Sequence, residues 1–290
     1  MFKGSIVAIV TPFNNGLVDE EKLRELVEFQ IAGGTDAIVP CGTTGESSTL
    51  DYEEHDRVVE IVINQVNKRV PVIAGTGSNS TAEAIEMSQH ARKLGADGCL
   101  LVTPYYNKPT QEGLYRHYTA IANAVAIPQI LYNVPGRTGV NLLPETVARL
   151  AEHKNIVAIK EATGSLQQAS EILALCGDKI DVLSGDDFIT FPMMACGAKG
   201  VISVLANIMP KAVGDLTDAF YAGDMGAARK LHLDTLKISN AMFIESNPVP
   251  VKTALGLMGK CSDEVRMPLC PLSDANKAKL AAIMKEYKLI

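Results

Sequence analysis

Lys160 is the side chain in this sequence with the greatest potential for covalent chemistry. It closes the apolar run Ile156–Lys160, and the two-residue period of a strand places it on the same face as Ile156 and Ala158, toward the inside of the fold. Burial there disfavours the ammonium form, and the neutral amine is a nucleophile toward carbonyl groups. The simpler alternative is an ion pair with Glu161 or another carboxylate at the rim. Lys160 is therefore a candidate for Schiff-base chemistry, and the residues in the other loops must decide between this role and an ion pair.

Two further residues belong to the preceding apolar run and its loop. Tyr132 ends that run and shares a face with Ile130. A phenol beside an imine-forming lysine can move protons while the carbinolamine forms and loses water. Arg137 follows in the loop Gly136–Gly139, where its planar guanidinium could bind a substrate carboxylate through two hydrogen bonds. The alternatives are a core tyrosine whose hydroxyl caps a loop and an arginine in a surface salt bridge.

The segment Gly42–Glu46 reads GTTGE and is typical of a tight turn with exposed backbone amides. The hydroxyl groups of Thr43 and Thr44 could bind a carboxylate or relay a proton to Tyr132. The segment lacks the G-K-[ST] of a phosphate-binding loop, so a phosphate site has little support. The turn is thus a candidate part of one site with Tyr132 and Lys160.

Eight short apolar runs, rich in β-branched residues, can position these groups, and an amphipathic stretch follows each run. Most runs are apolar on both faces, which is typical of parallel strands covered by helices. Eight such units predict a closed (β/α)8 TIM barrel with its reacting groups at the carboxyl ends of the strands. A doubly wound open sheet is the alternative, but no G-x-G-x-x-G follows the first run. The predicted strands are Ser5–Pro12, Ala37–Cys41, Val70–Thr76, Gly98–Pro104, Pro128–Pro135, Ile156–Glu161, Ile180–Ser184 and Gly200–Val204.

The strand pattern stops at about Ala222. We therefore expect a catalytic barrel domain over residues 1–222 and a C-terminal appendage of three helices over residues 223–290. This appendage contains no chemical motif, and we expect it to serve packing or subunit contact. The expected helices are Asp224–Ile244, Val249–Met258 and Ser273–Leu289.

The composition argues against several classes of function. The chain has 27 Lys and Arg against 33 Asp and Glu, a formal net charge of -6, and so lacks a basic footprint for nucleic acid or an anionic membrane. Neither an apolar run of transmembrane length nor a signal peptide is visible, so we expect a soluble, cytoplasmic protein. The five histidines show no metal-ligand spacing, and no metal site is predicted.

Four segments, in this order and spacing, resemble the pyruvate-dependent class I aldolase superfamily and, within it, the dihydrodipicolinate synthase family. The resemblance covers essentially the whole chain. The first and last segments are shared across the superfamily, whereas Arg137 and the pair Tyr105–Tyr106 narrow the choice to this family. The segments are GTTGE (Gly42–Glu46), TPYYN (Thr103–Asn107), YNVPGRTG (Tyr132–Gly139) and KEAT (Lys160–Thr163).

The resemblance implies that pyruvate forms a Schiff base with Lys160 and then condenses with L-aspartate 4-semialdehyde. The product would be 4-hydroxy-tetrahydrodipicolinate, in the first committed step of diaminopimelate and lysine biosynthesis, and no metal, flavin or pyridoxal cofactor is implied. The implied proton relay joins Thr43 and Tyr132 to Tyr106 of the adjoining subunit, so the site would need a dimer, within a homotetramer built as a dimer of dimers. The implied substrate-binding residues are Thr44 for the pyruvate carboxylate, Arg137 for the carboxylate of the semialdehyde, and Gly185 and Ile202 for the pocket lining.

The resemblance also implies a feedback site for lysine near the turn and the subunit contact. One position departs from the family pattern, because Tyr52 stands where inhibited bacterial relatives often carry histidine, and we expect this change to weaken lysine binding without abolishing it. Two members have simpler explanations: Glu83 fits a helix capping box with Ser80, and His55 could sit on a helix without binding a ligand. The matching residues are Ser47, Ser48, His55, Asn79, Glu83 and Tyr105.

Two other functions remain open from the sequence. A sister aldolase, such as N-acetylneuraminate lyase or a 2-keto-3-deoxy sugar acid aldolase, would use the same imine with a sugar aldehyde, but such relatives usually lack an arginine where this chain has Arg137. A noncatalytic barrel that binds keto acids is the second alternative. The presence of Lys160, Tyr132 and Thr43 together argues against it.

Overall fold

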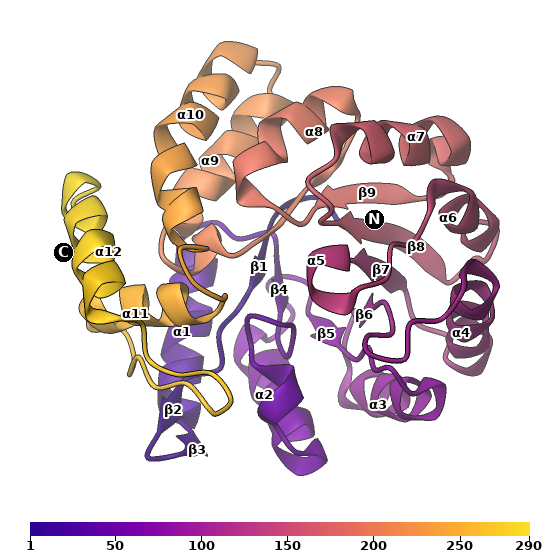
Figure 1. The fold of residues 1–290 in the computed structure, drawn as a ribbon, viewed down its shortest axis with the longest axis horizontal. Helices are drawn as coiled ribbons and strands as arrows, with labels where there is room; N and C mark the ends of the chain where they lie inside the picture. The colour runs from indigo at the N-terminus through magenta and orange to yellow at the C-terminus, as the bar shows by residue number, and fades with distance from the viewer.

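Eight parallel strands form the centre of the fold, and helices surround them in a ring (Figure 1). The computed structural model describes residues 1–290. The strands pair in the order β4-β1-β10-β9-β8-β7-β6-β5, and a parallel bridge from Ile38 to Val72 joins the two ends of the sheet. The predicted (β/α)8 barrel is confirmed, and the open sheet is excluded. The strands are β1 (Gly4–Ala8), β4 (Ala37–Val39), β5 (Ile73–Gly75), β6 (Gly98–Val102), β7 (Gln129–Asn133), β8 (Ile156–Glu161), β9 (Asp181–Ser184) and β10 (Gly200–Ser203).

Helices follow every barrel strand, and local sequence signals set several of their ends. The Asp19 side chain accepts a hydrogen bond from the backbone of Lys22 at the start of α1, and Gly95 ends α3 in the left-handed region at φ 100°. None of the helices has the length and apolar character needed to cross a bilayer. The helices are α1 (Glu20–Ala32), α2 (Tyr52–Val66), α3 (Thr81–Leu94), α4 (Gln111–Ala124), α5 (Pro135–Thr138), α6 (Pro144–Leu150), α7 (Leu166–Cys176), α8 (Thr190–Cys196), α9 (Pro210–Tyr221), α10 (Met225–Ala241), α11 (Val249–Leu257) and α12 (Asp274–Glu286), with short 3-10 turns η1 (Ser47–Thr49), η2 (Gly177–Lys179), η3 (Asp187–Ile189) and η4 (Leu205–Asn207).

Two hydrophobic clusters divide the barrel interior from the layer between strands and helices. The inner cluster has 13 buried residues and includes Ile130 and Tyr132, whereas Leu131 between them belongs to the outer cluster of 57. Side chains of β7 therefore alternate between the two clusters as a strand requires. Tyr132 projects into the barrel, as predicted.

Ile156 departs from the predicted alternation. It lies in the outer cluster although Ala158 lies in the inner one. The reason is a register irregularity between β7 and β8: Gln129 pairs with Ile156, but Ile130 pairs with Ala158. Because β8 carries one extra residue between these two pairs, Ile156 projects to the opposite face from the one that simple alternation predicts. Ala158 keeps its predicted place inside the barrel.

The first strand is shorter than predicted, since β1 ends at Ala8 rather than at Pro12. The following residues form a small antiparallel hairpin, β2 (Phe13–Asn14) and β3 (Leu17–Val18), which the apolar pattern did not indicate. Asn15 and Gly16 form its turn with positive φ angles of 53° and 82°.

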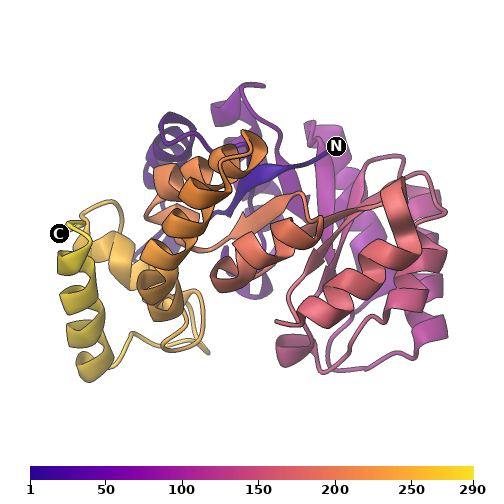
Figure 2. The same ribbon diagram turned by 90° about the horizontal axis from the view of Figure 1, so that it is seen from above.

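The C-terminal helices lie against one side of the barrel. Helix α10 packs on α9 and η3, and α11 packs on η4 and α12. In Figures 1 and 2, α12 lies at one end of the molecule, outside the ring of barrel helices. Residues 242–248 connect α10, which packs on η3, to α11, which packs on η4, and both of these turns follow barrel strands at their carboxyl ends. This connection therefore passes over the mouth of the barrel.

Candidate active site

Lys160 and Tyr132 occupy paired positions on neighbouring strands. They are register partners in the parallel pairing of β8 with β7. Both side chains are buried, each 6% exposed, and Nζ of Lys160 lies 4.2 Å from the centre of the Tyr132 ring. The face of an aromatic ring attracts a cation, so the ring helps to hold the amine at this position.

Glu161 does not pair with Lys160. Its carboxylate accepts hydrogen bonds from Asn133 Nδ2 at 3.0 Å, from Gln168 Nε2 at 3.2 Å and from the backbone N–H of Thr163 at 2.8 Å. Alternation along β8 directs the two neighbouring side chains to opposite faces. The ion pair with Glu161 considered as an alternative is therefore absent, and these contacts leave the lysine amine available for chemistry.

A cavity of about 110 Å³ lies above these two residues at the carboxyl ends of the strands. A space of this size accommodates a small keto acid or several water molecules. At the end of β9 the backbone must pass close to the loop after β8, because a Cβ on Gly185 would lie 2.4 Å from the Cβ of Ala162. The predicted site residues that line the cavity are Thr43, Thr44, Tyr132, Arg137, Lys160 and Gly185.

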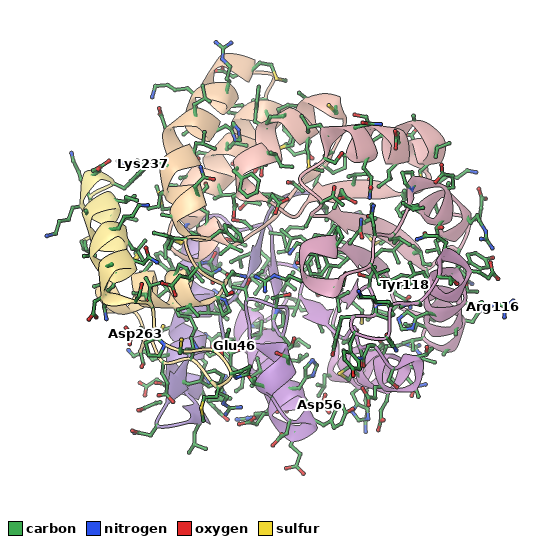
Figure 3. All side chains as sticks on the ribbon, in the orientation of Figure 1. Glu46, Asp56, Arg116, Tyr118, Lys237 and Asp263 are labelled. Carbon is green, nitrogen blue, oxygen red and sulfur yellow. The ribbon has the colours of Figure 1, made fainter.

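The turn Gly42–Glu46 is held by an ion pair with the C-terminal region. The buried carboxylate of Glu46 lies 2.6 Å from Nζ of Lys252 on α11 and also accepts from the backbone N–H of Arg266 at 3.0 Å. Burial lowers the pKa of Lys252, and the charge of Glu46 opposes this effect. Figure 3 shows Glu46 next to the C-terminal segment. Glu46 of the predicted turn is thus held by Lys252, a residue 206 positions later in the chain.

The segment between α10 and α11 supplies part of the cavity wall. Phe243 and Asn247 line the cavity together with Lys160. Nη2 of Arg137 donates to the carbonyl oxygen of Asn247 at 3.1 Å, and Nδ2 of Asn247 donates to Oγ1 of Thr44 at 3.0 Å. The expectation that the C-terminal region serves only packing or subunit contact is therefore wrong.

Two carboxylates, Asp186 and Asp187, follow β9. Neither was among the site residues predicted from the sequence. Asp186 lines the cavity; burial raises its pKa to about 6, and the positive charge of Lys160 opposes that rise. Asp187 is buried, accepts from Oγ of Ser203 at 2.5 Å and from two backbone N–H groups that follow β10, and has its pKa raised by burial. The run Gly185–Asp187 at a strand end is the sequence signal that could have identified both carboxylates.

A second pocket of about 590 Å³ adjoins the cavity and shares Thr43, Val134 and Arg137 with it. Most of the residues predicted for lysine binding line this pocket, and so does Tyr52. Asn79 is not among the lining residues, but its Nδ2 donates to the carbonyl oxygen of Tyr105 at 3.3 Å. The predicted residues that line the pocket are Ser47, Ser48, His55, Glu83 and Tyr105.

Hydrogen bonds orient two of these polar groups. Nε2 of His55 donates to the carbonyl oxygen of Gly75 at 2.8 Å. The Glu83 carboxylate accepts from Oγ of Ser78 at 2.7 Å, while its backbone N–H donates to Oγ of Ser80 at 3.4 Å. The predicted capping box is thus only half formed. The Glu83 carboxylate is directed to the pocket side instead.

Two of the predicted residues do not line the cavity. Tyr106 is 90% exposed and is not among the residues that line the cavity of its own chain. Ile202 is buried in the inner cluster of the barrel, and Val204, two residues further along, lines the cavity in its place.

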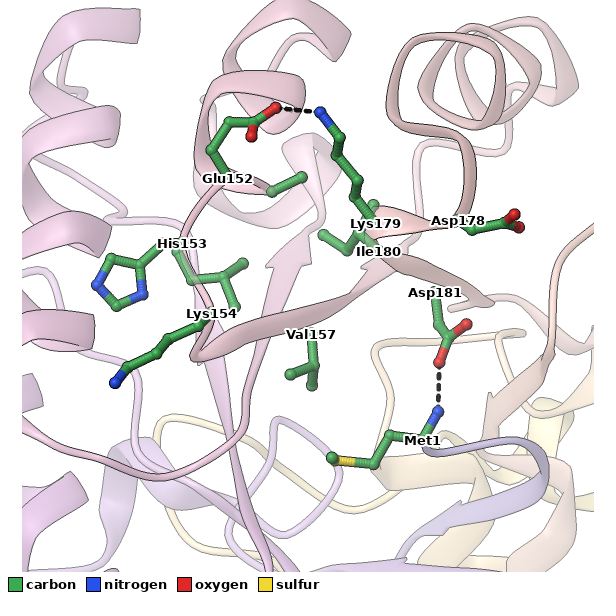
Figure 4. Close-up of a pocket in the computed structure, with 11 residues that line it drawn as sticks. Met1, Glu152, His153, Lys154, Val157, Asp178, Lys179, Ile180 and Asp181 are labelled. Atoms are coloured by element: carbon green, nitrogen blue, oxygen red, sulfur yellow. Dashed lines mark hydrogen bonds and ion pairs between the residues drawn. The ribbon is translucent and has the colours of Figure 1, made fainter.

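A third pocket, of about 300 Å³, lies at the amino ends of β8 and β9 and is drawn in Figure 4. The amino group of Met1 forms an ion pair with Asp181 at 2.6 Å beside it. In barrels of this kind the reacting groups lie at the carboxyl ends of the strands. This pocket is therefore separate from the candidate active site.

The fold and the cavity define a class of protein: an enzyme built on a (β/α)8 barrel, with a buried amine at the carboxyl ends of its strands. The model of the Dihydrodipicolinate synthetase family matches residues 1–287. The chain belongs to this family. It is a lyase, and its reaction is the first step of lysine and diaminopimelate biosynthesis.

Individual relatives resemble the chain over its full length. The 4-hydroxy-tetrahydrodipicolinate synthase of Geobacter sulfurreducens is 88% identical over 290 residues, which is 100% of both chains. A crystal structure of the chloride-inhibited dihydrodipicolinate synthase from Acinetobacter baumannii, complexed with pyruvate, is 51% identical and covers 100% of both chains with a TM-score of 0.98. The lysine-bound enzyme from Cyanidioschyzon merolae is 39% identical, with coverage of 100% of this chain and 99% of that one and a TM-score of 0.96.

Proposed function

We propose that Lys160 forms the Schiff base through which this enzyme condenses pyruvate with L-aspartate 4-semialdehyde. The observation that carries the proposal is the buried amine of Lys160, which lines a small cavity and lies 4.2 Å from the ring centre of Tyr132. A desolvated amine beside a phenol has both the nucleophile and the proton donor that imine formation requires.

The reaction begins with attack of the Lys160 amine on the keto carbon of pyruvate. The carbinolamine gains a proton on its hydroxyl group and loses water, which leaves an iminium ion. Loss of a proton from the methyl carbon gives the enamine, whose carbon then attacks the aldehyde carbon of the semialdehyde. The amino group of the semialdehyde finally attacks the imine carbon, closes the ring and releases Lys160 as a free amine. We assign the proton transfers to a relay of Tyr132, Thr43 and the Tyr106 of the partner protomer.

The carboxylates of the two substrates need separate donors. We assign the pyruvate carboxylate to Thr44 and the carboxylate of the semialdehyde to Arg137, both of which line the cavity. Gly185 lines it as well, with its backbone close to Ala162 in the loop after β8, and Ile202 supports the cavity from inside the barrel. A guanidinium at position 137 favours an aldehyde that carries a carboxylate over a neutral sugar.

An aldehyde panel tests this assignment against the sister aldolases. With pyruvate in excess, the purified enzyme should consume L-aspartate 4-semialdehyde with a kcat/KM about 10- to 100-fold above that for a neutral sugar aldehyde, since one well-made ionic contact is worth about 1.5 to 3 kcal/mol. Arg137→Met should lower the ratio between the kcat/KM for L-aspartate 4-semialdehyde and that for the sugar aldehyde. A preference for the sugar aldehyde would refute the proposed substrate.

We also propose that the pocket of about 590 Å³ binds lysine as a feedback inhibitor. It holds a carboxylate, Glu83, for the lysine amines, and it shares Thr43 and Arg137 with the active-site cavity. Burial and the charge of Glu83 raise the pKa of Tyr52, so its phenol stays protonated and can donate a hydrogen bond. Activity should fall with millimolar lysine, and Glu83→Gln should shift the inhibition curve to higher lysine. Constant activity over that range in the wild type would contradict the proposal.

We propose a homotetramer, built as a dimer of dimers, in the cytoplasm. The exposure of Tyr106 supports the dimer, because in the proposed relay this residue acts at the Lys160 site of a second protomer. Sedimentation velocity and cell fractionation test these two statements.

A further inference from the structure

Asn247 lies at the edge of the active-site cavity, where its backbone carbonyl and Nδ2 have partners and its Oδ1 has none. Its side chain is 6% exposed. The backbone carbonyl accepts from Nη2 of Arg137 at 3.1 Å, and Nδ2 donates to Oγ1 of Thr44 at 3.0 Å. The remaining group, Oδ1, is buried and accepts no hydrogen bond in the chain.

A buried oxygen without a donor is unfavourable, and most such groups in proteins are satisfied. Asn247 lines the cavity, so a bound substrate can supply the missing donor. Pyruvate cannot do so, because its keto and carboxylate oxygens only accept hydrogen bonds. L-Aspartate 4-semialdehyde can, because it carries an amino group.

The position of Arg137 indicates which part of the semialdehyde lies near Asn247. Its guanidinium is hydrogen-bonded to the backbone of Asn247. The carboxylate and the amino group of the semialdehyde are attached to the same carbon atom. A carboxylate bound by Arg137 therefore brings the amino group to the immediate neighbourhood of Asn247.

We propose that Asn247 is a specificity-determining residue whose Oδ1 accepts a hydrogen bond from the α-amino group of the semialdehyde. This inference rests on the proposed function and names the group that recognises the second substrate. The Nδ2 contact has a separate effect: it occupies Oγ1 of Thr44 as an acceptor, which leaves the hydroxyl proton of Thr44 free to bind the pyruvate carboxylate.

The test compares two aldehydes that differ only in the amino group. Succinic semialdehyde is the same molecule as L-aspartate 4-semialdehyde without the amine. At saturating pyruvate, the measured quantities are kcat/KM for aspartate semialdehyde and the inhibition constant of succinic semialdehyde as its competitor. Asn247→Ala should lower kcat/KM for aspartate semialdehyde about 10- to 100-fold, which is the effect expected from losing a hydrogen bond to a charged group. The inhibition constant of succinic semialdehyde should stay within about threefold of its wild-type value.

Two further variants separate the two halves of Asn247. Asn247→Asp keeps an acceptor at the Oδ1 position and should retain the preference for the amino-bearing aldehyde, while its KM for pyruvate rises. Thr44→Val should raise the KM for pyruvate and leave the ratio between the two aldehydes unchanged. If Asn247→Ala does not fold, loss of the preference in Asn247→Asp still overturns the inference.

Equal losses for both aldehydes in Asn247→Ala, or no loss for either, would refute the role of Oδ1. Borohydride reduction with pyruvate alone distinguishes this failure from failure of the proposed function. Every Asn247 variant should still give a reduced pyruvyl adduct on Lys160, because the amine contact is absent from that step. A wild-type enzyme without the adduct would refute the imine mechanism itself.

Discussion

Tyr132 faces Lys160 across the β7–β8 pair, with the lysine amine 4.2 Å from the centre of the tyrosine ring. The ring and the hydroxyl group of this tyrosine can therefore have different roles. The ring contacts the amine directly and helps to position it. The hydroxyl group is the part that can transfer a proton, and a single-atom change separates the two.

Tyr132→Phe should lower kcat about 100- to 10,000-fold, the usual contribution of a positioned general acid or base. The ring remains, so the melting temperature should change little. Tyr118→Phe is a matched control, because Tyr118, which is labelled in Figure 3, is fully buried and its hydroxyl donates only to the carbonyl oxygen of Leu101 at 3.2 Å. A kcat for Tyr132→Phe equal to that of the control would remove Tyr132 from the relay.

Tyr106 should act on the active site of a partner protomer. Mixed oligomers test this, because a Tyr106→Phe protomer keeps Lys160 and a Lys160→Ala protomer keeps Tyr106. Each variant alone should be nearly inactive, whereas a refolded equimolar mixture should recover up to about one quarter of wild-type activity through mixed dimers. No recovery, despite mixed oligomers shown by mass spectrometry, would argue against a shared site.

The buried pair Glu46–Lys252 should stabilise the fold and the turn that carries Thr43 and Thr44. Glu46→Gln leaves the Lys252 ammonium buried without its counter-ion, which should cost about 3 to 5 kcal/mol, and should raise the KM for pyruvate. Adding Lys252→Met should recover much of the stability. The exposed pair Lys230–Asp234 on α10 is the control, and Asp234→Asn should cost less than about 1 kcal/mol. Similar melting temperatures for Glu46→Gln and Asp234→Asn would contradict this role.

Asp186 should make stability fall as the pH rises. Burial raises its pKa to about 6, against the positive charge of Lys160, so the folded state holds the proton more tightly than the unfolded state does. The free energy of unfolding therefore decreases between about pH 4 and pH 6 and stays lower above that range. Asp186→Asn should raise the melting temperature by a few degrees at pH 8 and by less at pH 4. A larger gain at pH 4 than at pH 8 would show that the sign is wrong.

The sequence predicts the barrel well because each strand is a short apolar run and each run ends in a recognisable loop. The same regularity places Lys160, Tyr132 and the turn Gly42–Glu46 at one end of the barrel. Ile156 is the exception, because a register shift between two strands has no counterpart in the alternation of one strand.

Asn247 could not be predicted as a site residue from the sequence pattern. It lies 110 residues from Arg137 and outside any strand, and only tertiary packing of α10 and α11 brings it to the cavity. One local signal was available: Lys252 is the only charged residue in the apolar helix Val249–Leu257. A buried charge is unfavourable unless it is paired, so Lys252 indicates a buried carboxylate nearby. That carboxylate belongs to Glu46.

Reductive trapping of the imine tests the central claim most directly. The enzyme is incubated with pyruvate and sodium borohydride, digested and mapped by mass spectrometry, with the buried Lys252 as an internal control. We predict a reduced pyruvyl group on Lys160, none on Lys252, and loss of turnover in step with modification. An unmodified Lys160, or a Lys160→Ala enzyme with wild-type turnover, would contradict the account.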